Sequence, residues 1–220
     1  MVRTVMCFGD SNTHGTGPRA DGGARWRHGR DRRWTRLLAA RLGAGWEVIE
    51  EGHPSRTTVH ADPIDGAHKS GIAVLPALLE SHAPLDAVIL MLGTNDLKAR
   101  FSATPRAIGL GVERLARRIL STEWEAGAGP GGAAPRLLIV APPPVPEDGP
   151  FERDEPGAHA TSLAMGGEIG AAAGRLGVPF LDLNGIVRCD PVDGVHYDEA
   201  GHASLAGAIG DAFVAMMGRD

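Results

Sequence analysis

Short apolar runs alternate with longer stretches of helical character along the chain. The short runs are rich in β-branched residues and stop at glycine or proline, which is typical of strands buried in a sheet. We expect strands at residues 2–8, 47–49, 87–92, 137–140 and 178–181. We expect helices between and after them, at residues 34–42, 72–81, 105–120, 161–176 and 199–217.

This alternation predicts an α/β fold. Strands separated by helices form βαβ units, which give a mainly parallel sheet with helices on both faces. Ligands of such sheets bind beyond the carboxyl ends of the strands. Small, polar and amide-bearing residues gather there, at 9–13, 51–58 and 93–96. We therefore expect the functional site at this edge of the sheet.

Two segments are predicted to be loops. Residues 16–33 are rich in glycine and arginine and follow the first strand, where they could wall a pocket. Residues 125–135 form a tract of glycine, alanine and proline without periodicity, typical of a surface loop.

Composition narrows the class of protein. The length of 220 residues fits one domain spanning residues 1–220, and 43% hydrophobic with 22% charged residues is ordinary for a soluble globular protein. The net charge of −5 gives no basic face for nucleic acid, and the arginine-rich stretch 25–36 is expected to be a solvated loop. The chain has no signal-like start and no apolar run of membrane-spanning length. We expect a cytoplasmic protein that does not bind membranes.

The pattern of cysteines and histidines gives no indication of a metal or cofactor site, and we expect none. The two cysteines, Cys7 and Cys189, cannot form a disulfide framework, so we expect free thiols. The histidines are scattered without a repeated ligand spacing, which argues against a metal site.

Candidate chemistry begins at Ser11. A serine nucleophile needs a base within reach, an acid that orients the base, and donors for the developing oxyanion. Ser11 lies in a tight Gly-Asp-Ser turn between a strand and an expected helix start, where backbone N–H groups are unpaired. Asn95, at the end of another strand, offers an amide donor to the same space.

Asp193 and His196 supply the acid and the base. At a spacing of three residues, in a loop entering a helix, the carboxylate can reach the imidazole and fix its tautomer. Each element alone is common, because Ser after Asp is frequent and Asp-x-x-His also occurs in helix caps and metal sites. The interpretation depends on their combination.

These segments together resemble a known family. Residues 8–12 (FGDSN), residues 93–96 (GTND) and the Asp193-x-x-His196 pair, in this order, are similar to motif blocks of the SGNH (GDSL-like) hydrolases. Residues 50–52 followed by 56–58, and residues 90–96, are similar to the oligomeric bacterial arylesterase and acyltransferase branch. The resemblance covers nearly the whole chain. It implies a flavodoxin-like three-layer α/β/α sandwich with a five-stranded sheet, and a homo-oligomer whose neighbouring subunits narrow the entrance of the site.

The resemblance also assigns roles. Ser11 would be the nucleophile, His196 the base that takes its proton, and Asp193 the acid that orients the imidazole. The oxyanion would be held by the backbone N–H of Ser11, the side chain of Asn95 and one further backbone N–H. We favour Ser55 for that donor over Gly52, which we expect to shape the exit of the strand.

Two departures from the family pattern affect the pocket. Asn12 replaces the leucine of the GDSL motif, and His14 stands where related arylesterases tend to carry an aromatic residue, often tryptophan. We place Asp10, Asn12, His14 and Thr94 at the substrate pocket, with Asp10, like Asp96, capping and bracing the loops. A histidine at position 14 predicts a wider, more polar pocket that favours hydrolysis over acyl transfer. Its alternative interpretation is a surface histidine.

Three functions follow. The first is a serine esterase that hydrolyses short-chain carboxylic esters, acetyl or aryl, through an acyl-enzyme, with acyl transfer as a further activity and sugar or drug-like esters as further substrates. The second is a thioesterase or phosphoesterase with the same triad. The third, from a different class, is a flavodoxin-like module that binds phosphate or flavin through residues 9–17, an interpretation that leaves Asp193 and His196 without a task.

Overall fold

The sheet is parallel throughout the part of the chain that the computed structural model describes, residues 2–121 and 128–218. Its strand order is β2-β1-β3-β4-β5, the order of flavodoxin-like folds. The strands are β1 (Arg3–Gly9), β2 (Trp46–Gly52), β3 (Ala87–Met91), β4 (Arg136–Ala141) and β5 (Phe180–Asp182). The predicted fold class and all five predicted strands are confirmed, with ends that differ by at most three residues.

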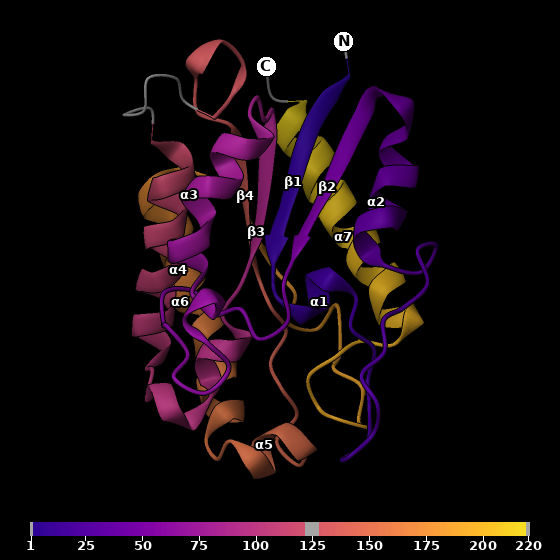
Figure 1. Cartoon of the computed structure of the whole chain (residues 1–220), viewed down its shortest axis with the longest axis vertical. Helices are drawn as coiled ribbons and strands as arrows, with labels where there is room; N and C mark the ends of the chain where they lie inside the picture. The colour runs from indigo at the N-terminus through magenta and orange to yellow at the C-terminus, as the bar shows by residue number, and fades with distance from the viewer. Residues whose placement is uncertain (1, 122–127, 219–220) are drawn as a thin grey trace.

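Helices cover both faces of the sheet and complete the three layers (Figure 1). One face carries α2 (Trp34–Leu42) and α7 (Glu199–Met217). The other carries α3 (Gly71–His82), α4 (Pro105–Leu120) and α6 (Ala158–Leu176). No helix in the described ranges is long and apolar enough to cross a bilayer.

Two hydrophobic cores fill the spaces between the layers. Leu90 and Ile139 point from the sheet into the core shared with α3, α4 and α6, whereas Val5 and Ile89 point into the core shared with α2 and α7. Every residue of β3 is buried because both of its faces are covered. This double burial explains why the strands are continuous apolar runs rather than alternating patterns.

Local signals fix the ends of the long helices. The Thr104 hydroxyl accepts a hydrogen bond from the N–H of Ala107 at 3.2 Å, and Pro105 occupies the first turn of α4. Asp198 caps α7 in the same way through the N–H of Gly201, at 2.7 Å. These caps explain why α4 and α7 begin at the predicted residues.

The short helices and the exact start of α6 were not predicted from the sequence. Helix α6 begins three residues earlier than predicted because Glu152 accepts hydrogen bonds from the N–H groups of Gly157 and His159. Of the predicted loop 125–135, residues 125–127 lie outside the described residues, and a 3-10 turn lies within the remainder. The short helices are α1 (Ser11–His14), α5 (Pro150–Asp154), η1 (Gly43–Gly45), η2 (Ala67–Lys69), η3 (Thr94–Leu97), η4 (Ala99–Phe101) and η5 (Pro130–Gly132).

Helix α1 is pressed onto the carboxyl ends of β1 and β2 (Figure 1). A Cβ atom on Gly52 would lie 2.0 Å from the backbone nitrogen of His14, and one on Gly9 would lie 2.1 Å from Oγ1 of Thr13. Neither position therefore tolerates a side chain without displacement of α1. Two glycines thus set the height at which α1 sits above the sheet.

We predict that Gly52→Ala destabilises the protein by about 1–3 kcal/mol, because the added methyl group meets backbone atoms that cannot rotate away. The midpoint and slope of urea unfolding measure the change. Gly45→Ala is the matched control, since nothing lies within 4 Å of a Cβ atom there. A Gly52→Ala protein as stable as the Gly45→Ala protein would contradict this packing constraint.

Candidate active site

Helix α1 places Ser11 at the carboxyl edge of the sheet. The Asp10 carboxylate caps the helix by accepting the N–H of Asn12 at 2.9 Å, and Gly15 ends it in a left-handed conformation. Ser11 is the first helical residue, where backbone N–H groups lack intrahelical partners. Its relative exposure of 7% leaves the side chain at the surface of a cavity rather than in the core.

The loop before α7 holds an acid and a base in contact. Oδ2 of Asp193 lies 2.7 Å from Nδ1 of His196, while Oδ1 accepts the N–H groups of Val195 at 3.1 Å and of His196 at 2.9 Å. The backbone N–H of Arg19 donates to Oδ2 from the loop 16–33, at 3.1 Å. The carboxylate thus fixes the imidazole by its Nδ1 edge, which leaves Nε2 for another partner.

The Asp193 carboxyl is ionised at neutral pH. Burial alone would raise its pKa, but the hydrogen bonds and charge of His196, with the N–H donors of the turn, outweigh burial and hold the pKa below its ordinary value. An ionised carboxylate can orient the imidazole and stabilise its protonated form.

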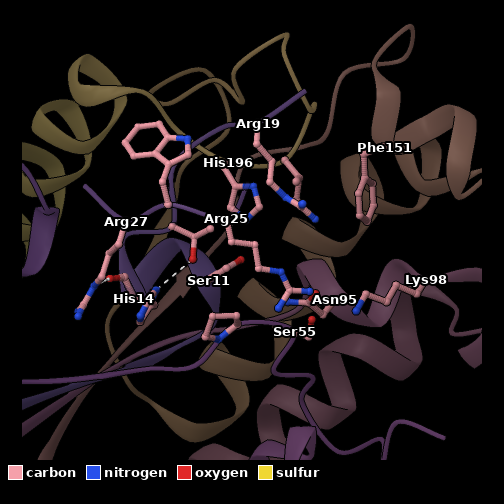
Figure 2. A pocket seen from close by; sticks show the side chains of 14 residues that line it. Ser11, His14, Arg19, Arg25, Arg27, Ser55, Asn95, Lys98, Phe151 and His196 are labelled. Atoms are coloured by element: carbon pink, nitrogen blue, oxygen red, sulfur yellow. Dashed lines mark hydrogen bonds between the residues drawn. The ribbon is translucent and has the colours of Figure 1, made fainter. Parts of the chain in front are cut away.

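Three distant segments meet in one cavity of about 410 Å³. Ser11, Asn95 and His196 all line it, and Figure 2 shows their side chains around the same space. Within the described residues, no hydrogen bond joins the Ser11 hydroxyl to the His196 imidazole. Catalytic hydrogen bonds of this kind often tighten only once substrate is bound. The arrangement can therefore support nucleophilic attack by Ser11 assisted by His196.

Two donors lie on the opposite wall of this cavity. Ser55 follows β2 with φ of 65°, an uncommon value for a residue other than glycine, and its N–H makes no backbone hydrogen bond to the described residues. Asn95 lies in η3, and its Nδ2 is 3.4 Å from Oδ2 of Asp10. Both residues line the cavity, whereas Gly52 does not.

The chain matches the model of the GDSL-like lipase/acylhydrolase family over residues 7–204. The chain belongs to this family. It is thus a carboxylic-ester hydrolase, and the resemblance identified from residues 8–12 and 93–96 is confirmed.

Solved structures agree with this family. An aryl esterase of M. smegmatis is 40% identical, with a TM-score of 0.89 and coverage of 98% of this chain and 100% of that one. Est24, a carbohydrate acetylesterase from Sinorhizobium meliloti, is 39% identical, with a TM-score of 0.89 and coverage of 97% and 99%. A second carbohydrate acetylesterase family member from that organism is 32% identical, with a TM-score of 0.88 and coverage of 99% and 100%. No curated protein sequence matches the chain.

The predicted pocket residues of this GDSL-family esterase fall into two groups. His14 lines the cavity, with Nδ1 3.0 Å from Oγ1 of Thr16. Burial, followed by the charges of Arg27 and Arg33, lowers the pKa of His14, so its imidazole is neutral at neutral pH. The interpretation of His14 as a plain surface residue is therefore wrong.

The other three residues do not line the cavity, which corrects the sequence-based placement. Asp10, Asn12 and Thr94 are at most 4% exposed. Asp10 is turned inward because it caps α1, and the Asn12 side chain donates to the carbonyl of Val195 at 3.1 Å. Thr94 starts η3 in the interior. Only the capping part of the prediction for Asp10 agrees with its position.

Two buried carboxyl groups brace the edge of the sheet. Burial raises the pKa of Asp10 to about 6, although the Asn12 N–H and the charges of His196 and Arg56 partly offset it. Burial likewise raises the pKa of Asp96 to about 7, even though its carboxylate accepts hydrogen bonds from the N–H and the hydroxyl of Thr58. As expected, Asp96 braces a loop instead of facing the cavity.

Arg56 has a structural role that the sequence analysis did not assign. Its guanidinium is buried, donates to the carbonyl of Gly9 at 2.9 Å and to that of Glu51, and stacks 4.3 Å above the ring of Phe8. It thereby ties the ends of β1 and β2 together. The sequence signal that could have revealed this role is that Arg56 is the one arginine among the small, polar residues 51–58.

The loop 16–33 does wall the cavity, as predicted. Arg19, Arg25, Trp26 and Arg27 come from it. The stretch 25–36 is therefore not simply solvated, although Arg30 is exposed. Phe151 and Lys98 also line the cavity. Phe151 ends the proline-rich stretch after β4, whereas Lys98 was not singled out from the sequence.

A buried histidine pair, His28 and His202, joins this loop to the segment that carries Asp193 and His196. Nε2 of His28 lies 3.0 Å from the carbonyl oxygen of Tyr197, and its ring packs against that of His202 at 4.7 Å. Nδ1 of His202 accepts the N–H of Trp34 at 3.4 Å. No cluster of potential metal ligands occurs in the described ranges. Cys7 and Cys189 are free thiols.

We predict acid sensitivity at His202. Burial, with the charge of His28, lowers its pKa from 6.5 to about 4. Below pH 6.5 the unfolded state takes up a proton that the folded state does not bind, so stability falls as pH falls and the loss is complete near pH 4. The loss amounts to about 3 kcal/mol at most.

His202→Asn keeps an acceptor near the Nδ1 position but cannot be protonated. Urea unfolding between pH 6.5 and 4 should therefore show a flatter decline for this variant than for the wild type. His68→Asn, at an exposed position, should keep the wild-type decline. Identical slopes for all three proteins would refute the role of His202.

Proposed function

We propose that the protein hydrolyses short-chain carboxylic esters, acetyl and aryl esters among them, through an acyl-enzyme on Ser11. The observation that carries the proposal is the meeting of Ser11, Asn95 and His196 in one cavity, with the imidazole held 2.7 Å from Asp193. The compartment and oligomeric state of the protein stay predictions.

The reaction follows from these positions. Nε2 of His196 takes the hydroxyl proton of Ser11 as Oγ attacks the carbonyl carbon of the ester. The negative charge on the carbonyl oxygen is met by the N–H groups of Ser11 and Ser55 and the amide of Asn95. The protonated imidazole then gives its proton to the leaving alcohol, and the carbon–oxygen bond breaks. Water, activated by the same imidazole, hydrolyses the acyl-enzyme.

The size of the cavity supports a short acyl group or an aryl group. A volume of about 410 Å³ is at the small end of ligand sites. Trp26, Phe151 and Val195 provide apolar surface for a ring or a short chain. The likeness to an aryl esterase at 40% identity and to a carbohydrate acetylesterase at 39% supports aryl and sugar acetates as the first substrates to test.

His14 supports hydrolysis over acyl transfer. A neutral imidazole hydrogen-bonded to Thr16 presents a polar surface at the cavity wall, where water can approach the acyl-enzyme. Exclusion of water is what allows an alcohol to compete for the acyl group. We infer that transfer is a minor activity.

We predict that Ser11→Ala lowers kcat/KM for phenyl acetate about 10⁴-fold or more, because no nucleophile remains. Asp193→Asn should lower kcat by about 10²–10⁴-fold, since a neutral amide cannot stabilise the imidazolium. Phenol release measures both variants. Ser204→Ala, at an exposed position of α7, is the matched control and should keep wild-type activity. Substantial turnover by Ser11→Ala would refute the mechanism.

We predict that His14→Trp raises the ratio of acyl transfer to hydrolysis, because the larger apolar ring removes water and a polar group from the cavity wall. The measurement is the ratio of ester to acid formed from phenyl acetate in water containing an alcohol. His68→Trp introduces the same ring at an exposed position outside the cavity and should leave the ratio unchanged. An unchanged ratio in His14→Trp would show that position 14 does not control water access.

A further inference from the structure

The proposed reaction does not use the positive charge of the cavity. Four cationic side chains line it, and no acidic side chain is among its described lining residues. The cations are Arg19, Arg25, Arg27 and Lys98. A simple acetate ester carries no charge that would require them.

Two of these cations are compensated by the protein. Nζ of Lys98 lies 3.1 Å from Oδ2 of Asp65, and the guanidinium of Arg27 donates to the carbonyl of His14 at 2.7 Å and lies 3.9 Å from the carboxylate of Glu50. These contacts account for both charges as parts of the wall.

The other two cations make no ion pair within the described residues, although Arg19 also lines an adjoining pocket that contains Asp21, Asp154 and Asp193. Within the described residues, Arg25 makes no hydrogen bond or ion pair, and the Arg19 guanidinium donates only to the carbonyl of Gly23, at 2.9 Å. Figure 2 shows the Arg25 side chain reaching across the cavity toward Asn95 and Ser55, and Arg19 on the side of Phe151. Both donor groups are thus available to a substrate bound at Ser11.

The loop that carries these arginines has a defined shape. The N–H of Gly17 donates to the carbonyl of Trp26 at 3.1 Å, and the indole N–H of Trp26 donates to the carbonyl of Pro18 at 2.7 Å. A Cβ atom on Gly17 would lie 2.2 Å from the indole ring of Trp26, so the outgoing and returning segments of the loop are in direct contact. Arg25 is therefore presented to the cavity from an ordered backbone.

We propose that the esterase prefers esters that carry a carboxylate near the scissile bond, and that Arg25, with Arg19, binds this group. The proposal rests on the esterase function above and adds its substrate class. A guanidinium matches a carboxylate with two parallel hydrogen bonds, and Arg25 and Arg19 are the two cations of this concave site that make no ion pair within the described residues. The ester chemistry at Ser11 is unchanged.

Two pairs of substrates test the proposal and locate the carboxylate. 4-Carboxyphenyl acetate and its methyl ester place the charge on the leaving group, whereas phenyl hydrogen adipate and its methyl ester place it on the acyl group. The readout is the ratio of kcat/KM for the anionic and the neutral member, from phenol release. Comparing this ratio between variants cancels the intrinsic reactivity of each ester.

We predict that Arg25→Gln lowers this ratio about fivefold in at least one pair, in line with the strength of a partly exposed ion pair. Arg25→Lys should restore part of the ratio, and Arg19→Gln combined with Arg25→Gln should lower it further. Salt at about 1 M should lower the wild-type ratio, because it screens exposed charges. Arg30→Gln is the matched control, since it removes a charge from an exposed position of the same loop outside the cavity.

The outcomes separate this proposal from the esterase function. A ratio that Arg25→Gln leaves unchanged in both pairs, while neutral esters are hydrolysed by way of Ser11, overturns the carboxylate preference alone. If Arg30→Gln lowers the ratio by the same factor as Arg25→Gln, the carboxylate preference is overturned as well. The effect would then come from the overall positive charge of the loop and not from binding by Arg25. Failure of every ester to react through Ser11 overturns both.

Discussion

The close contact of α1 with the ends of β1 and β2 is the constraint on which the site depends. Gly9 and Gly52 leave no side chain between the helix and the sheet, and the buried guanidinium of Arg56 joins the two strand ends below it. Ser11 therefore has a fixed height and direction before any substrate arrives. Such preorganisation is what nucleophilic catalysis requires of its scaffold.

Differences in environment give the three carboxyl groups at this edge different tasks. Asp10 and Asp96 are enclosed, and burial raises their pKa values toward neutrality, so they serve as hydrogen-bonding braces. Asp193 contacts an imidazole and three backbone N–H groups, which keep its pKa low. Asp10 and Asp96 also accept hydrogen bonds on both oxygens, so what distinguishes Asp193 is its contact with the His196 imidazole and its less complete burial.

Much of this could be predicted from the sequence because its signals were local. Continuous apolar runs marked the strands, Thr104 and Pro105 marked the start of α4, and the Asp193-x-x-His196 spacing marked a contact within one turn. The inward orientation of Asn12 and Thr94 could not be predicted, since it depends on what packs against α1 and η3 from elsewhere in the chain.

The walls of the cavity were harder to predict for the same physical reason. Residues 16–33 have no periodicity, so nothing in the sequence indicates which arginine faces inward. Phe151 and Lys98 reach the cavity from segments far along the chain. A wall built from several loops depends on tertiary packing, whereas the residues of the proposed triad were visible as motifs.

The backbone N–H of Arg19 donates to the Asp193 carboxylate, while its side chain lies in the cavity wall. Under the proposed roles, one residue therefore contacts both the substrate and the carboxylate that orients His196. Exchange of the whole loop between homologous enzymes would change both contacts at once, whereas a substitution of the Arg19 side chain would keep the backbone hydrogen bond to Asp193.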